Sequence, residues 1–280
     1  MDQHKEKRKY NNEHAPPGQH TSGRSRRTSS VLWLACLLAC IAVFCYSAWQ
    51  LFSYWNAGRA SDDYTGDLVQ QTVVQRPTPP PAVSQVQLPK EQAPIQVDFA
   101  ALQAQNPDVV AWLYSEDTVI NYPIAQADDN DYYLYRLLDG TENQNGSLFM
   151  DYRNQADFSD GNTLIYGHNM KTGKMFGTLD NYKKQEYFDQ HPVMWLLTPQ
   201  GDYKIELTAG WEIRDDDPLY AVPADATGRT TMIEQAYKQT TFRSDVQVTA
   251  EDSLITLSTC SYETDIARYV LLGRLTKLNE

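Results

Sequence analysis

Ser253-Leu-Ile-Thr-Leu-Ser-Thr-Cys260 is a short apolar run that ends at a cysteine, and Arg268-Tyr-Val-Leu-Leu272 follows it after a short gap. Both runs are rich in the residue types that favour β-strands. Because so few residues separate them, we expect the two strands to lie side by side and antiparallel. That arrangement would bring Arg268 close to Cys260.

Five further short runs of the same character lie earlier in the chain, and most are bounded by Gly, Pro, Asn or Asp. They are residues 119–123, 147–150, 163–167, 193–197 and 203–207. Many short strands with few helices between them are typical of a mainly β fold. We therefore predict an antiparallel or mixed β-barrel rather than a doubly wound sheet.

Helical patterns are few in the same part of the chain. Asp98 is a good N-cap, and apolar residues recur at helical spacing from 99 to 113. Pro107 interrupts that pattern, so we expect two short helices there. Further helices are predicted for residues 130–138 and 231–239.

Residues 31–52 form an apolar stretch of 22 residues without a charge, long enough to cross roughly 30 Å of bilayer hydrocarbon as a helix. Seven Lys or Arg residues and three Asp or Glu residues precede it. This basic excess predicts a cytoplasmic N-terminus and an extracellular remainder. A cleaved signal peptide is the alternative, but its apolar region is usually about 7–15 residues long and ends at small residues. We therefore predict an uncleaved anchor.

Composition also divides the rest of the chain. Residues 1–30 are polar and charged, which is typical of a disordered cytoplasmic tail. Residues 53–97 contain six prolines, so we expect an extended extracellular stalk there, from about Asn56 to Gln96. Residues 98–280 form the folded domain. After Ser53 the chain carries 17 basic and 33 acidic residues, which disfavours nucleic acid as a partner.

Cys260 is the only cysteine beyond the apolar stretch, since Cys36, Cys40 and Cys45 all lie within it. No intrachain disulfide is therefore expected in the outer domain. A lone cysteine is most often a buried core residue. Its position at the end of a strand, beside Ser and Thr residues, instead favours a nucleophile, which needs a base or a cation nearby.

Two histidines follow the apolar stretch, His168 and His191. His168 ends an apolar strand directly after Gly167. His191 precedes Pro192 in a charged stretch that is typical of an exposed turn. We therefore favour His168 as the partner of Cys260.

Arg268 would complete a set of groups able to transfer an acyl group. Most arginines form surface ion pairs, but this one opens an apolar strand. The thiolate would attack a carbonyl, the imidazolium would protonate the leaving amine, and the guanidinium would stabilise the oxyanion. No residue clearly completes a papain-like triad, although Asn169 and Asp151 remain candidates.

The acidic runs at 128–129 and 215–217 lack regular calcium-ligand spacing, so we interpret them as solvated turns and expect no metal.

Three of these segments resemble the active-site segments of sortases, the cysteine transpeptidases that attach proteins to the Gram-positive cell wall. They are Thr256-Leu-Ser-Thr-Cys260, Arg268-Tyr-Val270 and Tyr166-Gly-His-Asn-Met170. Class B sortases in particular are similar in a helix inserted between 213 and 248 and in four further segments: Asn106-Pro-Asp-Val-Val-Ala-Trp-Leu113, Ile120-Asn-Tyr-Pro-Ile124, Asp129-Asn-Asp-Tyr-Tyr-Leu134 and Gly146-Ser-Leu-Phe-Met-Asp-Tyr-Arg-Asn154. The resemblance covers about residues 97–278, essentially the whole folded part.

The resemblance implies a closed eight-stranded barrel with N-terminal helices, an inserted helix before the strand of Cys260, and no cofactor. It makes Cys260 the nucleophile, His168 the general acid and Arg268 the oxyanion or substrate clamp. It also suggests which residues line the groove for the sorting peptide: Ser258, Asn121 and Tyr220.

The function that the resemblance implies is a membrane-anchored transpeptidase whose extracellular catalytic domain is residues 98–280. It would cleave a C-terminal sorting motif of secreted proteins, hold the acyl group on Cys260 and pass it to a peptidoglycan amine. The alternatives are a thiol hydrolase that releases surface proteins, a pilin-polymerising enzyme with a lysine acceptor, and a non-enzymatic surface-binding barrel.

Overall fold

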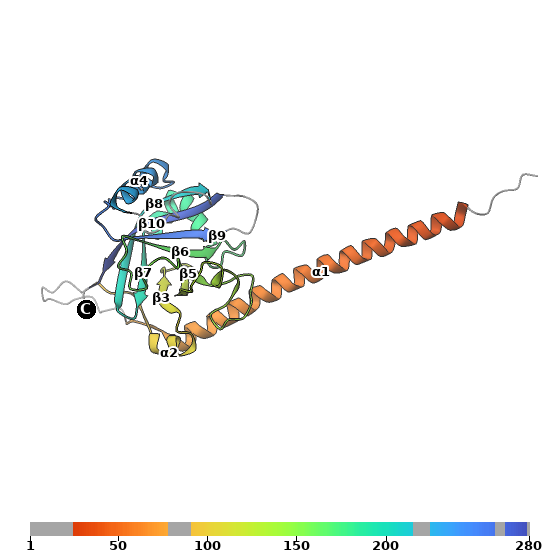
Figure 1. The fold of residues 1–280 in the computed structure, drawn as a ribbon, viewed down its shortest axis with the longest axis horizontal. Coiled ribbons are helices and arrows are strands. Elements are labelled where there is room, and N and C mark those ends of the chain that lie inside the picture. The colour runs from red at the N-terminus through yellow and green to blue at the C-terminus, as the bar shows by residue number, and fades with distance from the viewer. Residues whose placement is uncertain (1–24, 78–90, 215–224, 261–266, 279–280) are drawn as a thin grey trace, which may run out of the picture. The chain divides into compact units, whose positions relative to one another are not determined.

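The computed structural model describes residues 25–77, 91–214, 225–260 and 267–278. The chain forms two compact units, Met1–Ser53 and Tyr54–Glu280. The second unit is built around a closed barrel with the strand order β10-β8-β7-β3-β4-β5-β6-β9 (Figure 1). This confirms the predicted mainly β, eight-stranded barrel.

Six neighbouring strand pairs of the barrel are antiparallel, while β4–β5 and β6–β9 are parallel. All seven predicted strands are present, and β3 is an eighth. The bounds are β3 Val109–Tyr114, β4 Asn121–Ala125, β5 Leu148–Met150, β6 Asn162–His168, β7 Val193–Thr198, β8 Gly201–Arg214, β9 Leu254–Cys260 and β10 Ala267–Lys277.

Apolar side chains from all eight strands fill the barrel as one buried cluster. Along β9, Ile255 and Leu257 belong to this interior cluster, whereas Leu254 belongs to a cluster on the outer face. The alternation follows from the two-residue period of a strand.

Helix α4 (Ala226–Gln239) covers the outer face of β8, β9 and β10. Its apolar residues share one buried cluster with outer-face residues of these strands, including Trp211 and Val270. The side chain of Asp225 accepts a hydrogen bond from Gly228 N at 2.7 Å and caps the helix. The inserted helix predicted for residues 231–239 is thereby confirmed, with an earlier start.

A second outer face, formed by β3, β4, β5 and β7, is covered by α2 (Phe99–Gln105), β2 (Ile95–Val97) and the last turns of α1. Asp98 caps α2, as predicted, by accepting a hydrogen bond from Ala101 N at 3.0 Å. The second helix expected after Pro107 is wrong, because strand β3 forms instead. Leu113 belongs to the interior cluster and Trp112 to the outer one. The strand is therefore apolar on both faces, and the spacing of its apolar residues resembles that of a helix.

Residues 130–138 were also predicted as a helix, but they contain only the 3-10 turn η1 (Tyr133–Tyr135). The main-chain carbonyls that a helix would bond internally have other partners. Tyr133 O accepts from Ser147 N, and Tyr135 O accepts from Asn143 N, both at 2.9 Å. Pairing with residues 143–147 therefore replaces the predicted helix.

The segment after the apolar stretch differs from the extended stalk expected between Asn56 and Gln96. Helix α1 (Ser25–Thr72) continues because the first proline of this segment comes only at Pro77. Strand β1 (Val73–Gln75) then pairs with β2, and Leu68 of α1 is buried in the second outer face. Part of the expected stalk therefore packs on the barrel, while residues 78–90 lie outside the described residues.

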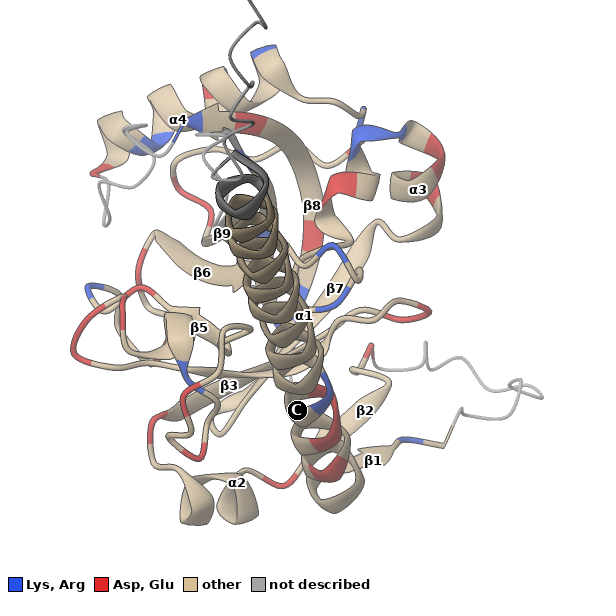
Figure 2. Cartoon of the chain, turned by 90° about the vertical axis from the view of Figure 1, so that its right-hand side faces the viewer, with Lys and Arg blue, Asp and Glu red and all other residues tan. Residues whose placement is uncertain are grey.

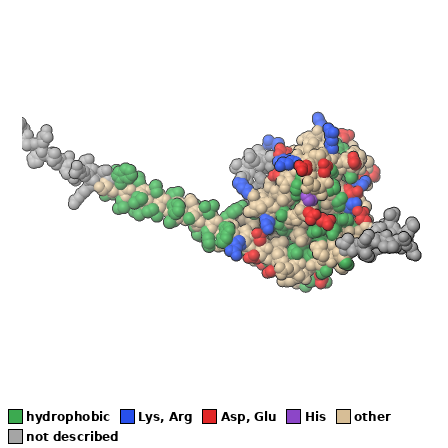
Figure 3. All heavy atoms as spheres, turned by 180° about the vertical axis from the view of Figure 1, so that it is seen from behind, with side chains coloured by type: hydrophobic (Ala, Val, Ile, Leu, Met, Phe, Trp, Pro, Cys, Tyr) green, Lys and Arg blue, Asp and Glu red, His purple; other side chains and the backbone are tan. Residues whose placement is uncertain are grey.

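Charged residues are spread over many helices, strands and loops, and the acidic ones occur on several separate elements (Figure 2). Such a distribution fits a role of the acidic excess in solubility. Helix α1 contrasts with this surface, because its large apolar side chains between residues 31 and 52 are exposed (Figure 3). By length and composition α1 can cross a membrane from Ser30 onward.

Candidate active site

Three predicted site residues lie at one end of the barrel, where β6 and β9 end and β10 begins; we call this the His168 end. In the parallel register of β6 and β9, His168 is paired with Cys260. In the antiparallel register of β9 and β10, Ser258 is paired with Val270, so the same register sets Arg268 level with Cys260. The predicted antiparallel pairing of these two strands is thereby confirmed.

His168 is held through both its ring and its main chain. The residue is only 1% exposed, and its Nε2 donates a hydrogen bond to Leu134 O at 2.6 Å. Its own carbonyl accepts from Phe176 N at 3.0 Å. A Cβ added at Gly167 would collide with the side chains of Leu148 and Phe176. Glycine therefore permits the close packing that fixes the end of β6.

Arg268 is partly exposed, and its Nη1 donates to Thr259 O at 3.4 Å. The next residue, Tyr269, donates its main-chain N–H to Thr259 Oγ1 at 2.9 Å. These two contacts tie the start of β10 to the end of β9. A guanidinium carries five N–H donors and keeps its charge, so it can serve a developing oxyanion as well as this carbonyl.

A lysine lies beside the strand of Arg268. Lys183 ends the 3-10 turn η2 (Leu179–Lys183), and its Nζ is 2.8 Å from Asp180 Oδ1, 2.8 Å from Glu212 Oε1 and 5.4 Å from the centre of the Tyr269 ring. Burial alone would lower the pKa of Lys183, but the two carboxylates outweigh it and raise that pKa. Burial also raises the pKa of Tyr269 to about 12. Both groups therefore keep their protons at neutral pH.

The described residues that were expected to line a peptide groove lie on strands that are not neighbours in the barrel. Ser258 is fully buried in β9, beside Cys260, and its Oγ lies 3.5 Å from Thr259 O. Asn121 opens β4, which β5 and β6 separate from β9, and its Oδ1 accepts from Trp112 Nε1 at 2.7 Å. Tyr220 lies outside the described residues.

The competing histidine, His191, lies elsewhere. It follows helix α3 (Gln185–Gln190), and its ring centre is 4.6 Å from that of Tyr187. Its neighbour Pro192 accepts a hydrogen bond from Leu207 N, further along β8 from Ile213, which pairs with Arg268. Of the two histidines, His168 is therefore the one that shares an end of the barrel with Cys260.

The two candidates for a third catalytic member have structural partners. Asn169 Nδ2 donates to Asp180 Oδ2 at 2.9 Å. Asp151 is fully buried and accepts from Arg153 Nε at 2.8 Å, Arg153 Nη2 at 2.7 Å and Tyr166 Oη at 2.9 Å. Burial alone would raise the pKa of Asp151, but the hydrogen bonds, chiefly from Arg153, hold it below its usual range. These contacts favour structural roles for both residues.

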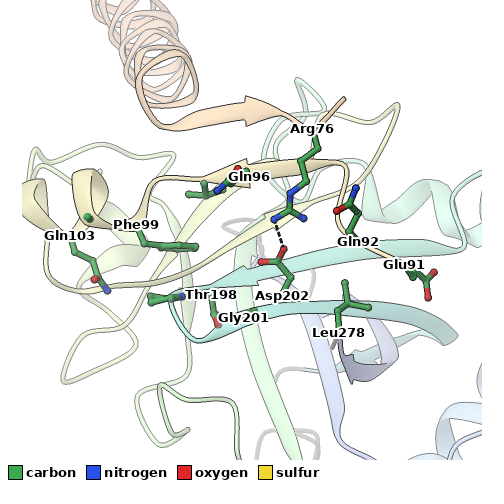
Figure 4. A pocket seen from close by; sticks show the side chains of 13 residues that line it. Arg76, Glu91, Gln92, Gln96, Phe99, Gln103, Thr198, Gly201, Asp202 and Leu278 are labelled. Atoms are coloured by element: carbon green, nitrogen blue, oxygen red, sulfur yellow. Dashed lines mark hydrogen bonds and ion pairs between the residues drawn. The ribbon is translucent and has the colours of Figure 1, made fainter. Parts of the chain in front are cut away.

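A cavity of about 660 Å³ lies at the other end of the barrel, beside the turn between β7 and β8; we call this the Asp202 end (Figure 4). Across it, Arg76 Nη2 is 3.0 Å from Asp202 Oδ2. On β8 the next residues, Tyr203 and Lys204, pair with the last residues of β10, so this cavity is separate from the His168 end. Within the described ranges, no cluster of three or more His, Cys, Asp or Glu could hold a metal.

One contact at the His168 end had no predictor in the sequence. The ring of His168 is bound by a main-chain carbonyl, that of Leu134, and a carbonyl leaves no residue-type signature. The one available signal was Gly146, whose φ of 56° suits glycine. A Cβ there would collide with Leu134 O.

The comparisons with known proteins all point to one family. The Sortase domain model matches residues 114–276. Sortase B of Listeria monocytogenes is 38% identical over 179 residues, which are 62% of this chain and 72% of that protein.

Solved structures agree with this match. Sortase B from B. anthracis has a TM-score of 0.64 at 32% identity, over 81% of this chain and 98% of that chain. A sortase B complexed with triglycine and a Staphylococcus aureus sortase B-substrate complex each have a TM-score of 0.62 at 28% identity. Each covers 65% of this chain, and the matches cover 86% and 85% of those chains.

Proposed function

The chain belongs to the sortase family and is a cysteine transpeptidase of class B, and from this premise we propose that it cleaves a C-terminal sorting motif of secreted proteins and joins the new end to a peptidoglycan amine. The observation that carries the proposal is the last pair of the β6–β9 register, His168 with Cys260, next to Arg268 on β10. These are the three residues that the chemistry requires at one place.

In the proposed acylation step, the Cys260 thiolate attacks the carbonyl carbon of the scissile peptide bond. The carbonyl oxygen becomes an oxyanion, which the Arg268 guanidinium stabilises. The C–N bond then breaks, and the His168 imidazolium gives its proton to the leaving amine. A thioester on Cys260 and a neutral imidazole remain.

In the second proposed step, an acceptor amine attacks the thioester carbonyl. His168 takes the proton that the amine loses, and the C–S bond breaks to return the Cys260 thiolate. The product is a new amide. Because one relative is known as a complex with triglycine and another as a substrate complex, we choose a glycine amine of the wall as the acceptor rather than a pilin lysine. Ser258, Asn121 and Tyr220 are proposed to line the peptide groove.

The proposed location is the cell membrane, with residues 31–52 as a single anchor and residues 1–30 in the cytoplasm. The support is the uncharged length of the stretch, the basic residues before it and the apolar helix α1. The catalytic domain would then lie outside the cell, where secreted proteins and cell-wall precursors are found.

The test is a ligation assay with the full-length protein in detergent. The peptide substrate carries the C-terminal motif of a secreted protein whose gene lies next to the gene of this protein. The acceptor amine is triglycine. We expect a peptide–triglycine product and a thioester adduct on the protein, both detected by mass spectrometry. Cys260→Ala should abolish both, and ligation that persists in this variant would contradict the proposal.

The same assay distinguishes a transpeptidase from the alternative, a thiol hydrolase. The first step is common to both, so only the product distinguishes them. Free peptide acid as the sole product at high triglycine would support hydrolysis and overturn transfer. Family membership already argues against the non-enzymatic surface-binding barrel.

A further inference from the structure

The hydrogen bond between His168 and Leu134 specifies where the ring carries a proton. A main-chain carbonyl can only accept, so at 2.6 Å the Nε2 atom of His168 must be the donor. The bond is compatible with the neutral Nε2–H tautomer and with the imidazolium, but not with the Nδ1–H tautomer. Which nitrogen of a histidine titrates is set by the bond that the other nitrogen makes.

The Leu134 carbonyl is itself held in place by its neighbours in the chain. The carbonyls on either side, those of Tyr133 and Tyr135, accept hydrogen bonds from Ser147 and Asn143. Gly146 lies directly against this turn. A Cβ at Gly146 would collide with the carbonyl oxygens of Leu134 and Tyr133, so only glycine leaves room for them.

The turn is also tied to helix α1 within the second unit. Asn143 Nδ2 donates to Ala57 O at 2.9 Å, while its Oδ1 accepts from Asn145 N at 2.9 Å. The loop that binds the His168 carbonyl contacts the same helix, because Lys174 Nζ lies 3.7 Å from Asp62 Oδ1. Both supports of His168 therefore dock on the part of α1 that follows Ser53.

We propose that the Leu134 main-chain carbonyl is a positioning group that keeps the resident proton of His168 on Nε2, so that Nδ1 exchanges protons with the substrate. Gly146 and Asn143 are the positioning residues that hold this carbonyl. The inference rests on the proposed function, because it assumes that His168 is the general acid. It assigns to the turn at η1 a part in catalysis that its residue types do not reveal.

The test compares two glycines that both have a positive φ. Gly146→Ala places a Cβ against Leu134 O, whereas at Gly140, with a φ of 83°, a Cβ would meet only Tyr132 Oη at 3.7 Å. The backbone strain of the substitution is thus similar in both, and only the contact with the carbonyl differs. Both variants are made in the full-length chain.

The main readout is the ¹⁵N spectrum of the histidine rings, recorded at a pH where His168 is neutral. Only His168 and His191 follow the apolar stretch, and the variants His168→Gln and His191→Gln assign their signals. We expect the Nε2–H tautomer in the wild type and in Gly140→Ala, and a mixture of tautomers in Gly146→Ala. The last variant should also lose roughly 10- to 100-fold in kcat, less than the roughly 10⁴-fold cost of a wholly wrong tautomer in a serine protease.

A second variant covers the case in which Gly146→Ala does not fold. Asn143→Asp keeps the oxygen that accepts from Asn145 N and removes the donor to Ala57 O. We expect it to show the same mixture of tautomers and a smaller loss of kcat. A unique Nε2–H tautomer in a folded but slow variant, or a mixture with unchanged kcat, would overturn the inference.

These results are separable from a failure of the proposed function. An Nδ1–H tautomer in the wild type would overturn the inference whatever the protein ligates. A wild type with the Nε2–H tautomer but no transpeptidation would contradict the proposed function, and would leave the carbonyl as a structural contact of His168.

Discussion

Arg76 and Arg268, at the two ends of the barrel, are held in different ways. At the Asp202 end, Arg76 is paired with Asp202, and Lys204 with Glu91. At the His168 end, Arg268 Nη1 donates to a main-chain carbonyl at 3.4 Å, and the His168 ring donates to another at 2.6 Å. Lys183 at this end is instead paired with Asp180 and Glu212. A carboxylate cancels a cation, whereas a carbonyl orients it and leaves its net charge in place.

The difference separates a stabilising role from a catalytic one. An ion pair stabilises a fold by mutual neutralisation, and its charge is then unavailable to a third group. An oxyanion formed during reaction needs a positive group that is already oriented and not yet neutralised. We propose that Arg268, which is bound to a carbonyl, supplies this group, and the following variants test the contrast with Arg76 from the largest expected effect to the smallest.

Arg268→Gln should have the largest effect, since removing one oxyanion donor costs about 10²–10³-fold in kcat. The free energy of unfolding should change by only about 1 kcal/mol, because the hydrogen bond to Thr259 O is long, at 3.4 Å, and Arg268 is partly exposed. Ligation kinetics and urea unfolding measure the two quantities. The matched control at the Asp202 end, Arg76→Gln, should leave kcat unchanged, and an equal loss of kcat in both variants would remove the contrast.

Asp151→Asn tests a buried carboxylate that is paired with Arg153 and lies beside Leu164 of β6. The folded pKa of Asp151 is below its usual range, so the carboxylate stabilises the fold above about pH 4 and loses this contribution as the pH falls through the folded value. The variant should lower the free energy of unfolding by about 3 kcal/mol at pH 7. Urea unfolding at pH 7 and below pH 4 checks this; a difference from wild type that does not shrink in acid would refute it.

Gly167→Ala tests the packing that fixes the end of β6. The added Cβ would meet Leu148 and Phe176, and such overpacking typically costs about 1–3 kcal/mol. Because His168 is the next residue, kcat should fall as well. Gly66→Ala in helix α1 is the control, since its Cβ meets nothing within 4 Å and should stabilise the helix by up to about 1 kcal/mol. A fully stable and active Gly167→Ala protein would show that this packing is dispensable.

Asp202→Asn should have the smallest effect. Its partner Arg76 is partly exposed, and pairs of this kind contribute about 1 kcal/mol or less. That contribution should shrink further at high salt, because exposed charges are screened. Thermal unfolding at low and high salt measures it. An activity loss in this variant would contradict the separation of the two ends.

Much of the barrel could be predicted from the sequence because its strands are short, β-prone and separated by turn residues. Strand β3 could not, since it is covered on both faces and its apolar spacing resembles that of a helix. The continuation of α1 was missed because the prolines after Pro77 suggested a stalk for the whole segment.

At the candidate site, the neighbouring strands of Cys260 and Arg268 followed from the short connection between them. The sequence offered two histidines as partners of Cys260. His168 was favoured because it ends an apolar strand, and the structure pairs it with Cys260. The Leu134 carbonyl could not be predicted, because a main-chain acceptor depends on how residues 130–147 fold and not on which side chain position 134 carries.

The parallel pairing of β6 with β9 joins residues 162–168 to residues 254–260, and β10 must follow before the sheet closes. Contacts so distant along the chain form late and slowly. A polypeptide still emerging from the ribosome, or clipped before its final strands, therefore has neither the thiol nor the guanidinium beside its imidazole. We expect such an incomplete chain to be inactive, because Cys260 and Arg268 lie on its last two strands.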